Sequence, residues 1–145
     1  MPNIEVSEKL ISFFTFLPLF FISLSVHEFA HALLASRLGD NTAKDQGRLT
    51  LNPFKHADII GTFVMPLASF ASGFALIGWA KPVPIDRRNF KNQMRDDAIV
   101  SFAGPFSNFL LALLFFAGFM IAYTSGSDYV MNFLWYGVFF NIFLF

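Results

Sequence analysis

Long stretches without a charged residue are the feature that most limits what this chain can fold into. Residues 59–80 give 22 residues without a charge, and residues 98–127 give 30. Residues 10–26 are also uncharged, and residues 129–145 are uncharged and mainly apolar. A helix needs about 20 apolar residues to cross the hydrocarbon core of a bilayer. We therefore predict an all-α membrane protein, a polytopic helical bundle that has the lipid bilayer as its surroundings.

The composition supports a membrane protein and excludes several other classes. Hydrophobic residues make up 55% of the chain and charged residues only 14%, whereas a soluble domain carries about 25% charged residues. The net charge is zero, which gives no case for a nucleic acid as partner. The chain has no cysteine, so disulfides, thiolate metal ligands and thiol catalysis are excluded.

The hydrophobic pattern indicates one integral-membrane domain over residues 1–145. Acidic Glu5 and Glu8 precede the first segment, so it does not have the form of a cleaved signal peptide. Gly104-Pro105 is expected to mark no more than the start of the third helix. The expected hydrophobic segments are about 10–38, 59–80, 98–124 and 129–145.

Segment 59–80 allows two readings. The connectors on both sides of it are rich in Lys and Arg, and such loops prefer the cytoplasmic side of a membrane. An ordinary single crossing would place the two connectors on opposite sides. A re-entrant path would place them on the same side, and helix-breaking residues suit a broken path that is buried against protein. The residues that favour this second reading are Gly61, Pro66, Gly73 and Gly78.

The first hydrophobic segment contains His27-Glu28-Phe29-Ala30-His31, which reads H-E-x-x-H. Residues i and i+4 share one face of a helix, so the two imidazoles can bind one Zn²⁺ ion. Glu28 lies about 100° further round the helix, where its carboxylate can take a proton from water and pass it to a leaving amine. The motif predicts a zinc-dependent peptidase with its metal inside a transmembrane helix.

A pair of buried, hydrogen-bonded histidines is the structural alternative to a metal site. Two imidazoles and a carboxylate are costly inside a membrane helix and are rarely found there without a function, so we favour the metal site. A catalytic zinc normally has three protein ligands and a water. His27 and His31 supply two of them, and no Glu follows Glu28. The third ligand is therefore an aspartate, His56 or absent.

Three further short motifs follow H-E-F-A-H along the chain. They are N-P-F-K-H-A-D at residues 52–58 with a glycine at 61, G-W-A-K-P-V-P at residues 78–84, and A-G-P-F-S-N at residues 103–108. Each is weak alone, but the four in this order resemble the site-2 proteases, which are intramembrane zinc metalloproteases. The G-W-A-K-P-V-P element is typical of a compact bacterial-type subgroup of that family.

The resemblance implies a helical membrane core around one zinc ion and hydrolysis of a peptide bond in a transmembrane protein substrate. It implies the plasma (inner) membrane of a prokaryote as the location. It also implies that the third zinc ligand is an Asp in a D-G motif on a later helix, and residues 141–145 resemble the approach to that helix. We therefore expect the sequence to be incomplete at its C-terminus and to bind zinc weakly as it stands. Asp58 is the main internal candidate to replace the missing ligand.

Four residues outside the H-E-x-x-H motif are candidates for substrate binding, each with a structural alternative. Asn52 and Pro53 would shape the substrate edge or form a plain turn. His56 would polarise the substrate or form an interfacial pair with Asp58. Asn108 would form a hydrogen bond near the site or serve helix packing.

A second function class stays open for this chain. A non-catalytic membrane protein would keep the same fold and bind partner helices without the third zinc ligand. The sequence itself favours catalysis through Glu28 with His27 and His31 as zinc ligands, and it leaves the oligomeric state undetermined.

We expect the protein to fractionate with membranes and to resist extraction by alkaline carbonate, because its long uncharged segments are stable in lipid and not in water. Immunoblotting of the carbonate supernatant and pellet measures this. Recovery in the soluble fraction without detergent would overturn the assignment to membrane proteins.

Overall fold

The computed structural model describes the backbone of residues 2–72 and 77–145, and within these ranges the side chains from Leu10 onward except Ser125. All regular elements in these ranges are helices, which confirms the all-α class. The elements are α1 (Pro2–Arg37), α2 (Thr42–Asp45), α3 (Pro53–His56), the π-helix η1 (Ile59–Val64), α4 (Met65–Ser72), the 3₁₀-helix η2 (Arg87–Asn89), α5 (Gln93–Ser125) and α6 (Asp128–Leu144).

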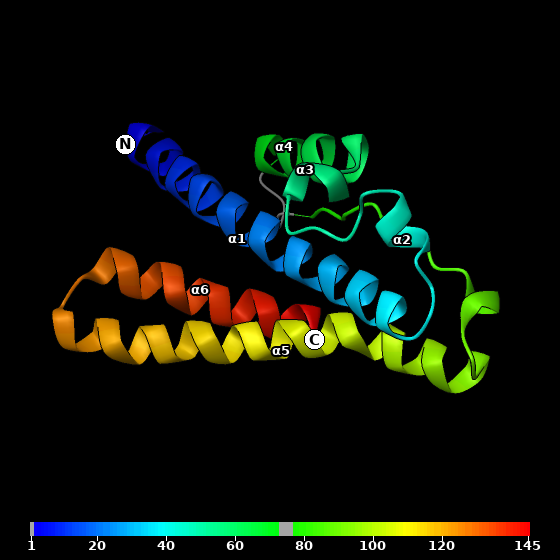
Figure 1. Ribbon diagram of the computed structural model, residues 1–145. Coiled ribbons are helices and arrows are strands. Elements are labelled where there is room, and N and C mark those ends of the chain that lie inside the picture. The colour runs from blue at the N-terminus through cyan, green and yellow to red at the C-terminus, as the bar shows by residue number, and fades with distance from the viewer. Residues whose placement is uncertain (1, 73–76) are drawn as a thin grey trace.

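Three long helices make the body of the molecule. α5 and α6 run antiparallel side by side, and α1 crosses them (Figure 1). The turn between α5 and α6 contains Gly126, which has φ 73° and ends α5 in the left-handed conformation that glycine adopts without strain. The short helices α2 and α3 contact α1, and in Figure 1 they lie on the side of α1 away from α5.

Two helices begin earlier than predicted from the sequence. α1 begins at Pro2 and not near Leu10, and proline is favourable in the first turn of a helix. α5 begins at Gln93 because the side chain of Asn92 accepts a hydrogen bond from the Arg95 N–H at 3.1 Å and caps the helix there. The expectation that Gly104-Pro105 only starts this helix is therefore wrong, since the pair lies well inside α5.

Segment 59–80 folds back on itself. The helical part ends at Ser72, and Gly73 lies outside the described residues. The returning chain bonds to the beginning of the segment, since the Trp79 N–H donates to the Gly61 oxygen at 3.0 Å and the Thr62 hydroxyl donates to the Trp79 oxygen at 2.9 Å. A Cβ atom at Gly61 would collide with the Trp79 indole. The two ends of the segment therefore lie together, as the re-entrant reading requires.

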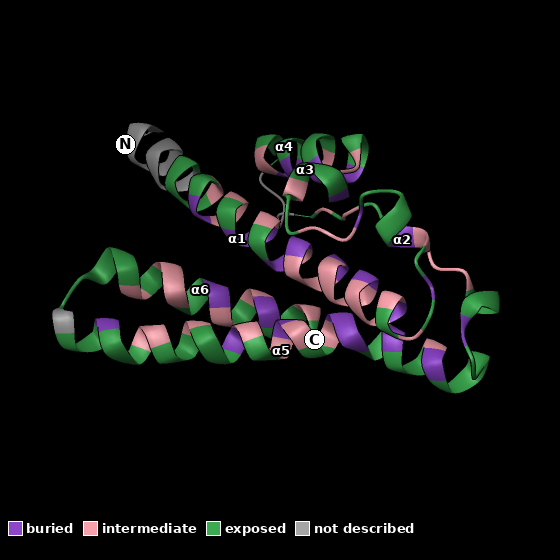
Figure 2. Ribbon diagram, viewed as in Figure 1, coloured by how far each residue is buried: buried purple, intermediate pink, exposed green. Residues whose placement is uncertain are grey.

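Within the described ranges, two helices are long and apolar enough to cross a membrane, judged by length and composition, namely residues 10–37 of α1 and residues 93–124 of α5. Only 28% and 17% of their most apolar windows are buried inside the structure. The core helix of a soluble protein would be mostly buried. Much of α5 and α6 is exposed (Figure 2). Many of these exposed residues are large and apolar, and such a surface favours apolar surroundings. Examples are Phe102, Leu114, Ile121, Phe139 and Phe143.

The folded-back segment predicts that the connectors before and after it lie on the same side of the membrane. The chain has no cysteine, so Lys44→Cys and Lys91→Cys, both at exposed positions, give single labelling sites in a clean background. We expect a membrane-impermeant maleimide added to sealed vesicles of one orientation to label both variants or neither. Labelling of one variant alone would show that the segment crosses once.

Candidate metal centre

The two motif histidines face α5 from the second half of α1. The ring centroids of His27 and His31 lie 4.8 Å apart, with an angle of 75° between the ring planes. Both side chains are half-buried, and each ring makes a hydrogen bond to α5. The helical spacing predicted from the sequence therefore places both imidazoles in the contact between these two helices.

Each imidazole uses its Nδ1 atom for the contact with α5. His31 Nδ1 lies 2.7 Å from the backbone oxygen of Val100, and His27 Nδ1 lies 2.6 Å from Oδ1 of Asn108. A carbonyl oxygen only accepts hydrogen bonds, so Nδ1 of His31 carries the hydrogen and its Nε2 keeps a free lone pair. Metal-binding histidines commonly have such a partner on the nitrogen that does not bind the metal.

Gly104 of α5 lets both Nε2 atoms approach the same point of that helix. A Cβ atom at this position would lie 2.5 Å from Nε2 of His27 and would also collide with Nε2 of His31. The two nitrogens therefore lie close to one another against α5, an approach that only glycine at this position allows. Two imidazole nitrogens this near each other can bind one ion, so the two histidines fit a zinc site.

No third His, Cys, Asp or Glu joins these two histidines among the side chains that the structure describes. Asp58, the internal candidate for the third ligand, accepts hydrogen bonds from the N–H groups of Ile60 and Gly61 at 3.0 and 2.7 Å. Its carboxylate caps η1. The described part of the chain thus supplies two nitrogen ligands of the kind that zinc takes, and Asp58 is not with them.

Glu28 is buried on α1 and faces the extended chain that follows Pro82. Its Oε2 atom accepts a hydrogen bond from the backbone N–H of Val83 at 2.9 Å. Together with His31, it lines a cavity of about 160 Å³ whose other walls come from this extended chain and α5. The carboxylate and one motif imidazole therefore share a space large enough for several water molecules.

Asp40, just past the end of α1, fixes one end of the extended chain at residues 77–86. Its carboxylate accepts hydrogen bonds from the backbone N–H of Asp86 and the side chain of Asn89, both at 2.8 Å. Burial alone would raise the pKa of Asp40, but the hydrogen bonds from Thr42, Asn89 and the Asp86 amide together hold that pKa below its ordinary value. The carboxylate therefore stays ionised and holds its partners at neutral pH.

Arg48 fixes the same chain on the other side of Val83. Its guanidinium is buried and donates to the backbone oxygen of Lys81 at 2.6 Å. The Lys81 N–H in turn donates to the His56 oxygen at 2.8 Å. The position of the Val83 amide, and with it the orientation of the Glu28 carboxylate, is thus set by residues from several loops.

The predicted substrate-binding residues of the 52–56 region lie against the other side of α1. Asn52 accepts a hydrogen bond from the Phe54 N–H at 3.0 Å and caps α3, and Pro53 is the first residue of that helix. His56 is 2% exposed, and its Nε2 lies 2.7 Å from the Thr50 oxygen. These contacts describe a capped turn, and the role of the three residues in substrate binding stays a prediction.

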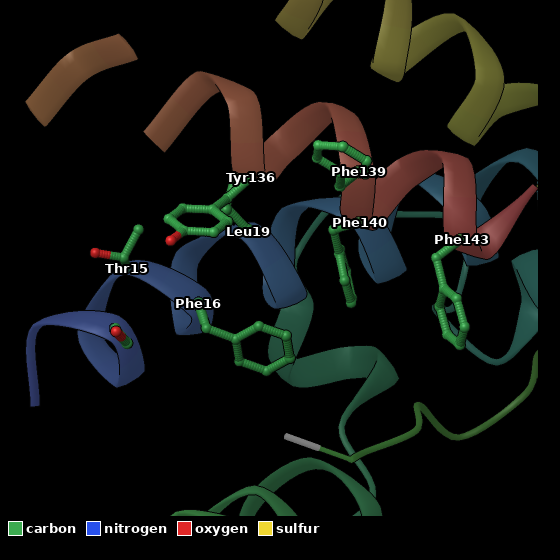
Figure 3. A pocket seen from close by; sticks show the side chains of 8 residues that line it. Thr15, Phe16, Leu19, Tyr136, Phe139, Phe140 and Phe143 are labelled. Atoms are coloured by element: carbon green, nitrogen blue, oxygen red, sulfur yellow. The ribbon is translucent and has the colours of Figure 1, made fainter. Parts of the chain in front are cut away.

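A larger cavity lies between the N-terminal half of α1 and α6, and it is separate from the histidines. Figure 3 shows Phe16 and Leu19 of α1 on one side and Phe140 and Phe143 of α6 on the other. Its volume is about 560 Å³ and its lining is almost wholly apolar. It contains none of the candidate catalytic residues, so the smaller cavity at Glu28 is the one suited to hydrolysis.

The sequence alone did not identify three residues of this site. Gly104 lies in the A-G-P-F-S-N motif, but its role depends on the neighbouring helix. Val83 acts through its backbone N–H, which has no sequence signal. Asn141 of α6 does not contact a histidine directly, but its Oδ1 atom accepts a hydrogen bond from Asn108 at 2.7 Å. Asn108 itself was predicted to lie near the site, and it does so as the partner of His27.

Several bacterial proteins are similar to this chain. "Putative zinc metalloprotease YwhC" of Bacillus subtilis is 43% identical over 112 residues, which are 77% of this chain and 48% of that protein. "Putative zinc metalloprotease Rip2" of Mycobacterium tuberculosis is 35% identical over 124 residues, covering 85% of this chain and 45% of the relative. The chain thus spans about half the length of these relatives. No solved structure matches it.

The sequence profile of Peptidase family M50 matches residues 15–144, which include the two histidines, Glu28, Gly104 and Asn141. This match covers most of the chain. The relatives are named as zinc metalloproteases, and imidazoles such as the pair between α1 and α5 are common zinc ligands. The chain therefore belongs to peptidase family M50, the family of the site-2 proteases.

Proposed function

We propose that this chain forms the zinc-binding core of a membrane-embedded metallopeptidase that hydrolyses peptide bonds of transmembrane proteins. The observation that carries the proposal is the approach of the His27 and His31 Nε2 atoms to the same point of α5 at Gly104, beside a buried carboxylate that faces a cavity. The relatives are named as zinc metalloproteases, which supports an enzyme over the non-catalytic membrane protein considered from the sequence.

His27 and His31 would hold one zinc ion through their Nε2 atoms. Bound there, the ion would supply Lewis acidity, polarising a peptide carbonyl and making water a stronger nucleophile. The remaining ligands would come from outside the described side chains.

Glu28 would act as the general base and then the general acid. The Val83 N–H holds its Oε2 atom, and no described group bonds to its Oε1 atom, which is therefore the oxygen left to accept a proton from water. The carboxylic acid formed in this way would then protonate the amine of the departing peptide. A positioned acid or base of this kind contributes about 10²–10⁴-fold to the rate.

The surroundings of the site support a substrate that reaches it within the bilayer. α1 and α5 are apolar over lengths that can cross a membrane, and the histidines lie between these helices. A bacterial plasma membrane is the location that the bacterial relatives favour. Water would have to reach the cavity at Glu28 from the side of the polar loops that contain Asp40 and Arg48.

Glu28→Gln in the full-length protein should reduce cleavage of a fluorogenic transmembrane peptide by at least about 100-fold and leave zinc content unchanged. Glutamine keeps an oxygen that can accept from the Val83 N–H but cannot take up the proton. Zinc is measured by mass spectrometry on the same purified sample. His31→Ala is the contrasting variant and should lose zinc together with activity. Cleavage by Glu28→Gln at the wild-type rate would refute the assigned base.

Gly104→Ala should lower zinc affinity by at least about tenfold, because the added methyl group would fill the space between the two Nε2 atoms and displace the rings, as changes next to a metal ligand do. Gly118→Ala is the matched control in the same helix, since its methyl group would meet only the two side-chain methyl groups of Leu134, at 3.3 and 3.6 Å. Competition with a chromogenic chelator measures both. Equal affinities for the two variants would contradict the site.

A further inference from the structure

Two buried asparagines connect His27 to the backbone of α6. Asn108 of α5 and Asn141 of α6 are both fully buried, with 0% exposure. An unpaired amide in an apolar interior is unfavourable, so buried amides are retained where they have hydrogen-bond partners. Here the Nδ2 of Asn108 donates to Oδ1 of Asn141 at 2.7 Å, and Oδ1 of Asn108 faces His27.

The orientation of each amide follows from a backbone carbonyl at the far end. Asn141 Nδ2 lies 2.8 Å from the backbone oxygen of Gly137, and this oxygen can only accept. Oδ1 of Asn141 therefore faces Asn108, and only Nδ2 of Asn108 can donate to it. The same Nδ2 lies 3.4 Å from the Ser23 oxygen, a second acceptor. Turning the Asn108 amide over would place its oxygen against two oxygens, so the amide has one favourable orientation.

This fixed orientation determines which nitrogen of His27 carries the hydrogen. The Asn108 oxygen lies 2.6 Å from Nδ1 of His27, and an oxygen acceptor requires a hydrogen on Nδ1. Nε2 is then left with a free lone pair on the side of Gly104. His31 reaches the same state through the backbone oxygen of Val100 alone. Only His27 depends on side chains for its tautomer, and the last of them belongs to α6.

We propose that Asn141 is a positioning residue that selects the Nδ1–H tautomer of His27 through Asn108 and so links α6 to metal binding at α1. The part that concerns zinc rests on the function proposed above, whereas the tautomer of His27 is a property of the metal-free protein. Asn141 touches neither histidine. Its effect passes through the Asn108 amide, which would be free to turn over if its acceptor on α6 were removed.

Two substitutions at position 141 separate the hydrogen bonds from the packing. Asn141→Leu keeps a similar volume and removes both the acceptor for Asn108 and the donor to Gly137. Asn141→Asp keeps the shape, and in this buried position the carboxyl group stays neutral. Its O–H can then donate to the Gly137 oxygen while its C=O accepts from Asn108, so the chain of hydrogen bonds is preserved.

The decisive measurement is the tautomer of each histidine in metal-free protein, read from long-range ¹⁵N–¹H correlation spectra of ¹⁵N-histidine-labelled samples in micelles. In the wild type we expect the Nδ1–H form at both His27 and His31. In Asn141→Leu we expect His27 to become a mixture of tautomers, while His31 stays unchanged as the internal control for the α1–α5 contact. In Asn141→Asp both rings should match the wild type. If the His31 signal shows that Asn141→Leu does not fold, Asn141→Ala replaces it.

Zinc affinity, measured by chelator competition, gives the second readout. Asn141→Leu should bind zinc about 10- to 100-fold more weakly, and Asn141→Asp should bind like the wild type. A pure Nδ1–H tautomer of His27 in Asn141→Leu would overturn the proposal, as would an Asn141→Asp variant that behaves like Asn141→Leu. Failure of the wild type to bind zinc would count against the proposed function alone, because the tautomer spectra would still support or overturn the role of Asn141.

Discussion

The close contact between α1 and α5 at Gly104 is the constraint on which the rest of the site depends. A side chain at position 104 would occupy the same space as both imidazoles, so the two helices can pack with the histidines between them only because that residue is glycine. The Val100 oxygen, one turn earlier, is then in reach of His31, and Asn108, one turn later, is in reach of His27. Three residues on consecutive turns of α5 thus match the spacing of the H-E-x-x-H motif.

Buried polar groups give this contact its register. Apolar helices in lipid gain little from burying one another, since lipid chains are as apolar as their side chains, and their relative position is set by packing and by hydrogen bonds between polar groups. Here the polar groups pair across elements, with His31 to α5, Asn108 to α6 and Glu28 to the extended chain. A shift of α5 by one residue would separate the two pairs that involve α5. The same residues that could bind metal therefore also specify how the helices fit together.

The sequence could predict what depends on local spacing. Apolar length was enough for the helical class, and the spacing of the two histidines was enough to place His27 and His31 side by side on α1. Their role as metal ligands stays a prediction. The sequence could not predict contacts between distant segments. The Trp79 N–H donates to the Gly61 oxygen, 18 positions earlier, and the Val83 N–H donates to Glu28, 55 positions earlier. The start of α5 was misplaced because residues 95–97 are charged, although charged residues form a capped first turn as readily as apolar residues do.

The orientation of Glu28 separates its role from that of the histidines. Both Nε2 atoms point at α5, whereas the Glu28 carboxylate points to the extended chain at Val83, on another part of the α1 surface. One of its oxygens is already held by a backbone N–H, a fixed donor that cannot move away. A carboxylate placed as a third ligand would have to turn toward Gly104 and give up that bond. Because Asp40 and Arg48 anchor the chain that supplies the N–H, this turn would leave a buried donor unsatisfied, at a cost of about 1–3 kcal/mol. The fold thus keeps Glu28 directed into the cavity that it shares with His31, as the general base proposed above requires.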